Sequence, residues 1–130
     1  MRIPFYDCDP MGVSWHGHYI KYFEKARYDL LEKLDYNYEA MRDNGHAWPI
    51  VKINAKYIHP LIFGQKIIVK SAIIEIENRL RITYTIYDET KQTIHCKGET
   101  IQMAVDVETK NTLFMSPQIL LDKMNDAKKS

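Results

Sequence analysis

Cysteine is scarce in this chain: Cys8 and Cys96 are its only two in 130 residues. Two cysteines cannot form a disulfide framework, and neither belongs to a Cys-x-x-Cys pair. Proline and glycine, with five residues each, form no linker, and no repeat or low-complexity tract divides the sequence. We therefore expect a single domain, residues 1–130, in a reducing, cytoplasmic setting, with a polar tail that frays from about residue 125.

An excess of charge of one sign is also absent. Lys and Arg number 18, Asp and Glu number 17, and the formal net charge is +1. No field of the whole molecule would draw it to nucleic acid or to an anionic membrane. Any anionic ligand must therefore be held by a few local cations.

Long apolar runs are missing as well. Asp7 and Asp9 fall where the apolar core of a signal peptide would lie, and no stretch approaches the length of a membrane span. We expect a soluble protein.

The residues that are present show two clear periods. From His18 to Leu34, apolar residues recur every three or four positions, which predicts a helix of about four to five turns. The period then changes to two, which predicts strands over residues 51–57, 67–76 and 80–87. Short polar turns between the later strands indicate antiparallel hairpins.

A further long strand is expected from Thr93 to Val107. Its apolar residues occupy even positions at Ile94 and Cys96 but odd positions from Ile101 onward. An inward face cannot change parity without an extra residue, so a bulge or bend is predicted between Gly98 and Ile101. One long helix with antiparallel strands is an α+β pattern. A curved sheet wrapped around the helix would bury the apolar faces of both the helix and the sheet.

Chemically versatile side chains gather just before the helix, between Tyr6 and His18. This segment holds two carboxylates, a thiol, two imidazoles and two glycines. An acid held before a helix start can lie beside free backbone N–H groups. One short segment can thus supply both a reacting carboxylate and a site for developing negative charge.

The motif Tyr6-Asp7-x-Asp9-x-x-Gly12-Val13, followed by Tyr19 and residues 22–27, resembles the N-terminal signature of the YbgC-like and 4-hydroxybenzoyl-CoA thioesterases. The likeness continues through residues 50–60 and covers nearly the whole chain. Those enzymes have the hotdog fold, so the resemblance implies a hotdog fold of about five antiparallel strands around one central helix. The sequence departs from the pattern at Gln65, where relatives often have Asp after the glycine.

The resemblance implies hydrolysis of an acyl-CoA thioester to a free acid and CoA, with no metal and no cofactor. The catalytic carboxylate of the family falls on Asp9, which would act as a nucleophile that forms a mixed anhydride or as a general base on water. The thioester carbonyl would face the helix N-terminus, where a backbone N–H near His16 and Gly17 polarises it.

These residues also have plainer interpretations. Asp9 precedes a proline and can simply start a turn or cap the helix. The ring of His16 can orient water or the carbonyl, or it can pack while only its backbone matters. Cys8 lies between two acids, which disfavour a nucleophilic thiolate.

The same segment also offers donor atoms for a metal ion. Its spacing matches no zinc motif, and histidines two residues apart diverge on a helix, so we predict no metal site. The donors weighed are Asp7, Cys8, Asp9, His16 and His18.

The phosphates of CoA need placed cations in a nearly neutral protein. Arg79 and Arg81 lie near where related enzymes contact the nucleotide, although solvated strand-edge charges remain an equal interpretation. The sheet also leaves an exposed edge, and the resemblance implies a homodimer or homotetramer with active sites at the interface between subunits.

The sequence therefore predicts a small acyl-CoA thioesterase. The alternative is a non-catalytic hotdog module that binds CoA esters or a protein partner. A hydratase on the same fold would need a His and an acid placed for proton abstraction, and no such pair stands in a matching context.

Overall fold

A computed structural model describes residues 2, 17–62, 64–90 and 92–129. Within them the chain forms three helices and six strands. In chain order these are α1 Gly17–Lys33, α2 Tyr38–Asp43, β1 His46–Ala47, β2 Ile50–Tyr57, β3 Ile67–Glu75, β4 Leu80–Asp88, β5 Ile94–Gln102, β6 Val105–Asp106 and α3 Gln118–Lys129.

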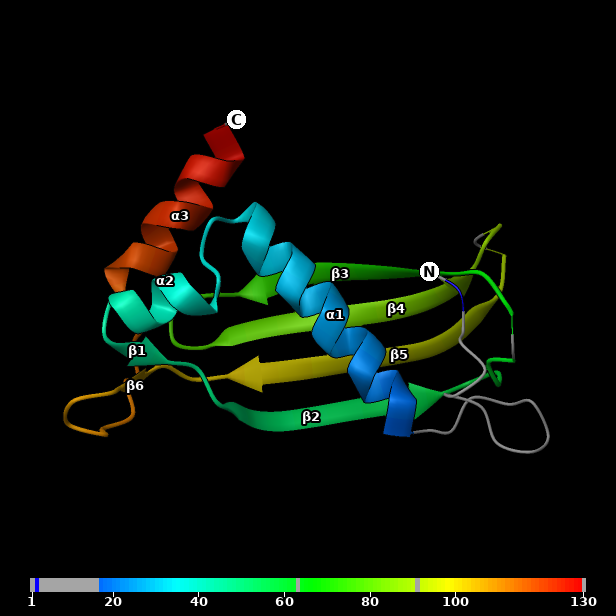
Figure 1. The fold of residues 1–130 in the computed structure, drawn as a ribbon, viewed down its shortest axis with the longest axis horizontal. Helices are drawn as coiled ribbons and strands as arrows, with labels where there is room; N and C mark the ends of the chain where they lie inside the picture. The colour runs from blue at the N-terminus through cyan, green and yellow to red at the C-terminus, as the bar shows by residue number, and fades with distance from the viewer. Residues whose placement is uncertain (1, 3–16, 63, 91, 130) are drawn as a thin grey trace. The chain divides into compact units, whose positions relative to one another are not determined.

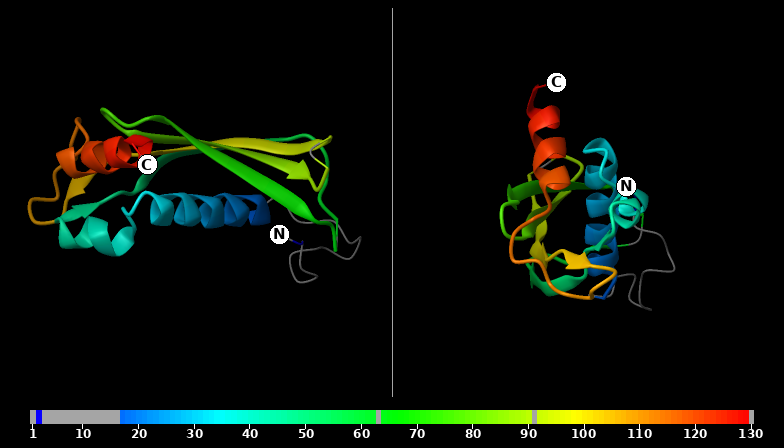
Figure 2. Two further views of the ribbon diagram at one scale, coloured as in Figure 1. Left: turned by 90° about the horizontal axis from the view of Figure 1, so that it is seen from above. Right: turned by 90° about the vertical axis from the view of Figure 1, so that its left-hand side faces the viewer.

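The four long strands form one sheet in the order β2-β5-β4-β3 (Figure 1). Short turns join β3 to β4 and β4 to β5, so these neighbours run antiparallel. Figure 2 shows α1 along one face of this sheet. The short strands β1 and β6 pair with each other in a second, antiparallel sheet, with His46 opposite Asp106. The architecture is the predicted α+β arrangement.

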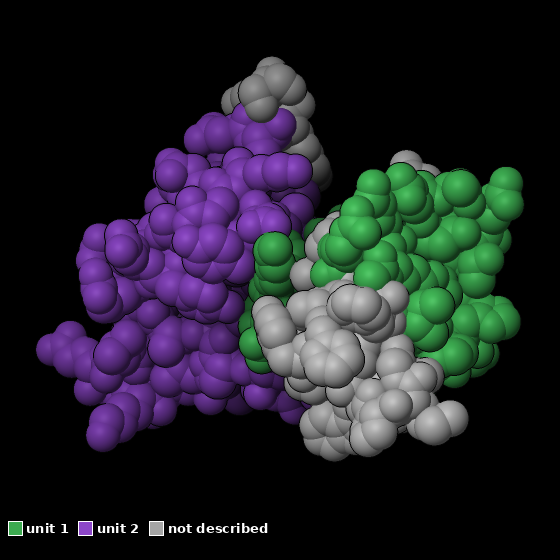
Figure 3. Space-filling model, turned by 45° about the vertical axis from the view of Figure 1, so that its right-hand side comes forward, with its two compact units in different colours: residues 1–27, 54–72, 83–99 green, residues 28–53, 73–82, 100–130 purple. Residues whose placement is uncertain are grey.

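The chain divides into two compact units, coloured separately in Figure 3. The first unit comprises residues 1–27, 54–72 and 83–99, and the second comprises residues 28–53, 73–82 and 100–130. Each unit contains part of α1 and part of every long strand. The single domain expected from the sequence stays a prediction.

Aromatic side chains of α1 form the core of the first unit. Tyr19, Tyr22 and Phe23 are almost completely buried. The ring of Phe23 stacks on that of Tyr84 in β4, with the ring centroids 4.7 Å apart. Such a stack adds roughly 0.5–1.5 kcal/mol to the free energy gained from burial.

Gly98 of β5 makes this close packing possible. A Cβ atom built at Gly98 would clash with the ring of Phe23 and would approach the backbone oxygen of Asn54. A side chain at this position would therefore displace the ring that packs the helix on the sheet.

The second unit has its own core, which includes Leu31, Tyr36 and Trp48. The indole N–H of Trp48 donates to the Tyr36 hydroxyl at 2.9 Å. The side-chain amide of Gln102 donates to the Trp48 carbonyl at 2.7 Å. These bonds satisfy polar groups that would otherwise be costly to bury.

Local polar contacts set the ends of the helices in this unit. Asp35 follows α1 with a φ of 58°, a left-handed conformation in which Asp is better tolerated than most residues. Its carboxylate pairs with Lys123 of α3 at 2.9 Å. Asn37 caps α2, because its side-chain oxygen accepts a hydrogen bond from the Ala40 N–H at 2.9 Å.

The predicted long helix is confirmed, and so are the strands predicted over residues 51–57, 67–76 and 80–87, which the structure has at residues 50–57, 67–75 and 80–88. The last strand is shorter than predicted: β5 ends at Gln102, and residues 103 and 104 separate it from β6, whereas the bulge or bend between Gly98 and Ile101 stays a prediction. The pair β1 and β6 and the helices α2 and α3 were not predicted, and α3 includes residues 125–129. Outside the named strands, Arg2 forms an isolated antiparallel bridge with Lys66.

Candidate active site

The first turn of α1, which begins at Gly17, belongs to the first unit. The first four N–H groups of an α-helix have no partner within the helix, and the helix dipole places partial positive charge there. The first turn of α1 contains no acidic residue that would offset this charge. The turn is therefore suited to an oxygen that gains negative charge.

A pocket of about 210 Å³ lies beside this turn in the same unit. It is lined by Tyr19 of α1, Tyr57 of β2 and the segment Ile58–Pro60 that follows β2. The rings of Tyr19 and Tyr57 meet edge to face, with centroids 5.0 Å apart. The lining is largely aromatic and aliphatic, as in pockets that bind small organic groups.

Residues 58–62, which follow β2, are called the pocket wall. Backbone hydrogen bonds attach this wall to β5. The carbonyl oxygen of His95 accepts hydrogen bonds from the N–H groups of Ile58, at 2.9 Å, and His59, at 3.1 Å. The hydroxyl of Tyr19 accepts a third from the N–H of Leu61, at 3.0 Å. The wall is thereby joined both to the sheet and to the first turn of α1.

The hydroxyls of Tyr19 and Tyr57 and the thiol of Cys96 keep their protons near neutral pH. Burial raises the pKa of the Tyr19 and Tyr57 hydroxyls above the usual 10.0. Burial also raises the pKa of the Cys96 thiol from 9.0 to about 12. None of the three is a base or an anionic nucleophile near neutral pH, so a reacting anion must come from another residue.

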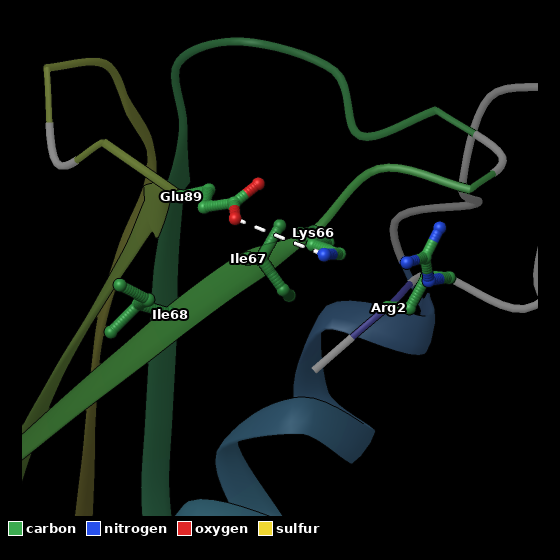
Figure 4. Close-up of a pocket in the computed structure, with 5 residues that line it drawn as sticks. All are labelled: Arg2, Lys66, Ile67, Ile68 and Glu89. Carbon is green, nitrogen blue, oxygen red and sulfur yellow. Dashed lines mark ion pairs between the residues drawn. The ribbon is translucent and has the colours of Figure 1, made fainter.

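A second pocket of the first unit, of about 310 Å³, is lined by two basic side chains (Figure 4). Arg2 and Lys66 line it together with Ile67, Ile68 and Glu89. The Lys66 ammonium lies 3.9 Å from a Glu89 carboxylate oxygen, and a guanidinium nitrogen of Arg2 lies 3.4 Å from the Gly64 carbonyl oxygen. The lining carries a net charge of about +1 if all three charged groups are ionised. No sequence pattern pointed to this pair, because their approach depends on the bridge between Arg2 and Lys66.

The predicted site residues are placed as follows. Asp9 and His16 lie outside the described residues, and Gly17 is the first residue of α1. Arg79 forms an ion pair with Glu75 within the β3–β4 hairpin. Arg79 and Arg81 belong to the second unit, whereas both pockets above belong to the first.

A metal centre has no candidate among the described residues, where no three His, Cys, Asp or Glu side chains gather. The five donors weighed in the sequence lie outside the described side chains. In the same part of the chain, no helix combines the length and the apolar character that crossing a bilayer requires.

Comparison with known proteins matches residues 3–123 to the family model described as the thioesterase-like superfamily. The chain belongs to the thioesterase-like superfamily. The resemblance inferred from the motif around Asp9 is thereby confirmed at the level of the family.

Two curated proteins are similar to this chain in sequence. A protein of Aquifex aeolicus named as an esterase is 31% identical over 84 residues, which are 65% of this chain and 63% of that protein. YneP of Bacillus subtilis, whose name provisionally assigns it an acyl-CoA thioesterase activity, is 28% identical over 111 residues, which are 84% of this chain and 79% of YneP.

A solved structure shares the fold. The DHNA-CoA thioesterase of Staphylococcus aureus superposes with a TM-score of 0.83 at 24% identity, over 99% of this chain and 85% of that one. Together with the observed strand order and the helix on the sheet, this likeness identifies the predicted hotdog fold.

Proposed function

We propose that this chain is an acyl-CoA thioesterase, which hydrolyses the thioester bond to a free carboxylic acid and CoA. The observation that carries the proposal is the pocket beside the first turn of α1, in a chain of the thioesterase-like superfamily. The pocket offers an apolar place for an acyl group next to the first N–H groups of the helix, which have no acceptor within the helix and suit a polarised carbonyl oxygen.

In the proposed reaction, the thioester carbonyl oxygen lies against the backbone N–H groups at Gly17, with His16 beside it. Negative charge that develops on this oxygen is stabilised by those N–H groups and by the positive end of the helix dipole. The neutral groups of Tyr19, Tyr57 and Cys96 supply no competing charge.

Asp9 supplies the reacting carboxylate. As a nucleophile, one of its oxygens forms a bond to the carbonyl carbon, the C–S bond breaks, and CoA leaves as a thiolate that takes up a proton. Water then hydrolyses the mixed anhydride to the free acid and regenerates Asp9. As a general base, Asp9 instead takes a proton from the water that attacks the carbonyl carbon, the C–S bond breaks, and the leaving CoA thiolate takes up that proton. Thiolate is a good leaving group, so one carboxylate and one oriented helix dipole suffice to catalyse hydrolysis of the thioester.

The anionic end of CoA would be held by cations of this chain. Arg79 and Arg81 remain the residues proposed from the sequence, although Arg79 already pairs with Glu75. Arg2 and Lys66 are better supported, because they line a pocket in the unit that contains the start of α1. Their contacts at 3.4 Å and 3.9 Å are long for strong pairing, so both cations can turn to a phosphate.

We further propose that β2 pairs with β2 of a second copy. This strand is an edge of the four-stranded sheet, and its residues are exposed along almost the whole length. Val51, Ile53 and Tyr57 contribute exposed apolar area there. A free edge of this kind favours strand pairing between chains, which would give a homodimer with a continuous sheet. Two such dimers would form the homotetramer.

Hydrolysis of a panel of acyl-CoAs, followed through the released thiol, tests the proposed activity. Turnover of at least one ester supports it, and a cytoplasmic location would then match the free Cys96. Binding of CoA esters without turnover of any of them would favour the non-catalytic module instead.

A further inference from the structure

The imidazole of His95 is enclosed between two polar partners of the pocket wall. The residue lies on β5 in the first unit and is only 5% exposed. Its Nδ1 lies 3.3 Å from the carbonyl oxygen of His59, and its Nε2 lies 3.0 Å from the side-chain nitrogen of Gln65. Both ring nitrogens are therefore in hydrogen-bond range of the segment between β2 and β3.

A separate contact determines which way the Gln65 amide points. Its side-chain oxygen accepts a hydrogen bond from the Ile62 N–H at 3.1 Å. The amide NH₂ group is thus the part that faces His95, and this group can only donate.

These partners determine where the proton of His95 resides. The His59 carbonyl can only accept, so Nδ1 must carry the hydrogen, and the Gln65 amide nitrogen can only donate, so Nε2 must hold a lone pair. The two requirements agree on a neutral imidazole protonated at Nδ1. A chain of hydrogen bonds then runs from Ile62 through Gln65 and His95 to His59.

We propose that Gln65 and His95 are positioning residues for the wall of the candidate active site, an inference that rests on the proposed thioesterase function. The backbone oxygen of His95 accepts hydrogen bonds from the N–H groups of Ile58 and His59. Its ring donates to the His59 carbonyl and accepts from the Gln65 amide, whose oxygen in turn accepts from the Ile62 N–H. Hydrogen bonds from both ends of the wall, at Ile58 and at Ile62, thus lead to the buried residue His95.

The exposure of the wall explains why these bonds determine its position. Ile58 is 40% exposed and Ile62 is 51% exposed, so apolar burial contributes little at the two ends of the segment, whereas Leu61 between them is buried. A segment with few buried apolar contacts moves readily unless hydrogen bonds restrain it. The pair acts on the substrate through the wall and does not touch the reacting atoms.

The experiment begins with the native protein labelled with ¹⁵N at histidine. The resonances of His95, assigned by their loss in His95→Asn, are expected to show a hydrogen on Nδ1 and a lone pair on Nε2. A hydrogen on Nε2 in the native protein would overturn the proposed orientation.

Kinetics of two Gln65 variants then separate positioning from general structure. Gln65→Leu removes both amide contacts and should raise KM for an acyl-CoA roughly fivefold with kcat changed less than about twofold. Gln65→Glu keeps an acceptor for Ile62 and accepts a hydrogen from His95 Nε2, so KM should return toward the wild-type value while His95 becomes doubly protonated. Gln92→Leu makes the same change at an exposed glutamine and should alter neither constant.

Amide hydrogen exchange makes the test independent of activity. Gln65→Leu should speed exchange at the Ile58 and Ile62 N–H groups by roughly fivefold or more, whereas Gln92→Leu should not. Unchanged exchange with unchanged KM in Gln65→Leu would overturn the inference even in an active thioesterase. Faster exchange in a protein that hydrolyses no acyl-CoA would support the wall contacts and contradict the proposed function alone.

Discussion

The hydroxyl of Tyr19 accepts a hydrogen bond from the backbone N–H of Leu61, at a distance of 3.0 Å. Tyr19 lies in the first turn of α1 and Leu61 in the segment after β2, and each is at most 1% exposed. This bond therefore attaches the pocket wall to the helix start at which the proposed chemistry takes place.

Replacing Tyr19 by Phe should leave the Leu61 N–H buried without its acceptor. An unsatisfied buried donor costs about 1–3 kcal/mol, so the free energy of unfolding should fall by that amount in urea titrations. Tyr28→Phe removes a hydroxyl from a residue that is 49% exposed and should change stability by less than about 0.5 kcal/mol. Equal losses in both variants would contradict a specific role of the Tyr19–Leu61 bond.

Gly98→Ala tests the close approach of α1 to the sheet. The added methyl group would clash with the Phe23 ring, which stacks on Tyr84, and overpacking of this kind costs roughly 1–3 kcal/mol. Thermal and urea unfolding measure this loss. The exposed neighbouring change Lys97→Ala is the control and should have little effect, and a Gly98→Ala protein of wild-type stability would refute the described packing.

Cys96 should make the folded state less favourable as the pH rises above 9. Burial raises the pKa of its thiol from 9.0 to about 12, so between these values the folded protein keeps a proton that the unfolded chain has released. This contribution is fully present below about pH 9 and is lost as pH rises toward 12. At about pH 10 the loss is about 1.4 kcal/mol.

Cys96→Val isolates the contribution of the thiol to the free energy of unfolding, because the tyrosines, which also titrate at high pH, are the same in both proteins. The decrease in the free energy of unfolding between about pH 8 and about pH 10 should be about 1.4 kcal/mol smaller in Cys96→Val than in the wild type. Identical decreases in the two proteins would indicate that the thiol is not held neutral by burial.

The main elements could be predicted because each has its own local pattern. The apolar spacing of α1 and the alternation of β4 are complete within their own segments. Helix α3 carried a weaker signal, since Leu120 and Met124 are followed by a polar end that suggested a frayed tail. The sequence pattern of β5 implied a change of face before Ile101, whereas residues of both faces are buried from Thr100 to Gln102.

The contacts of the candidate site depend on tertiary structure and left no local signal. Gln65 and His95 are 30 residues apart and meet only because β2 lies beside β5 in the sheet. In the sequence, Gln65 was a departure from the family pattern and His95 an isolated histidine. Their pairing requires the register of the strands, which alternation alone does not specify.

Lys66 should contribute to binding through the nucleotide end of CoA. Lys66→Gln removes a cation from the pocket that it shares with Arg2, so KM for an acyl-CoA should rise about threefold to tenfold while KM for the matching acyl-pantetheine, which lacks the nucleotide, stays constant.

Lys70→Gln is the matched control for this experiment. Lys70 lies on β3, four residues after Lys66, with its ammonium 5.8 Å from the centre of the Tyr87 ring, and does not line the pocket. A parallel rise of KM for acyl-CoA in both variants would point to general electrostatics. An effect of Arg79→Gln that exceeds that of Lys66→Gln would favour the pair proposed from the sequence.

The most direct test of the account is the rate of thiol release from acyl-CoA by the wild type, Asp9→Asn and Cys8→Ala. Removal of the reacting carboxylate should lower kcat by at least roughly 100-fold in Asp9→Asn with folding unchanged, and Cys8→Ala should retain turnover within about twofold of the wild type. Turnover at the wild-type rate in Asp9→Asn would contradict the proposed mechanism.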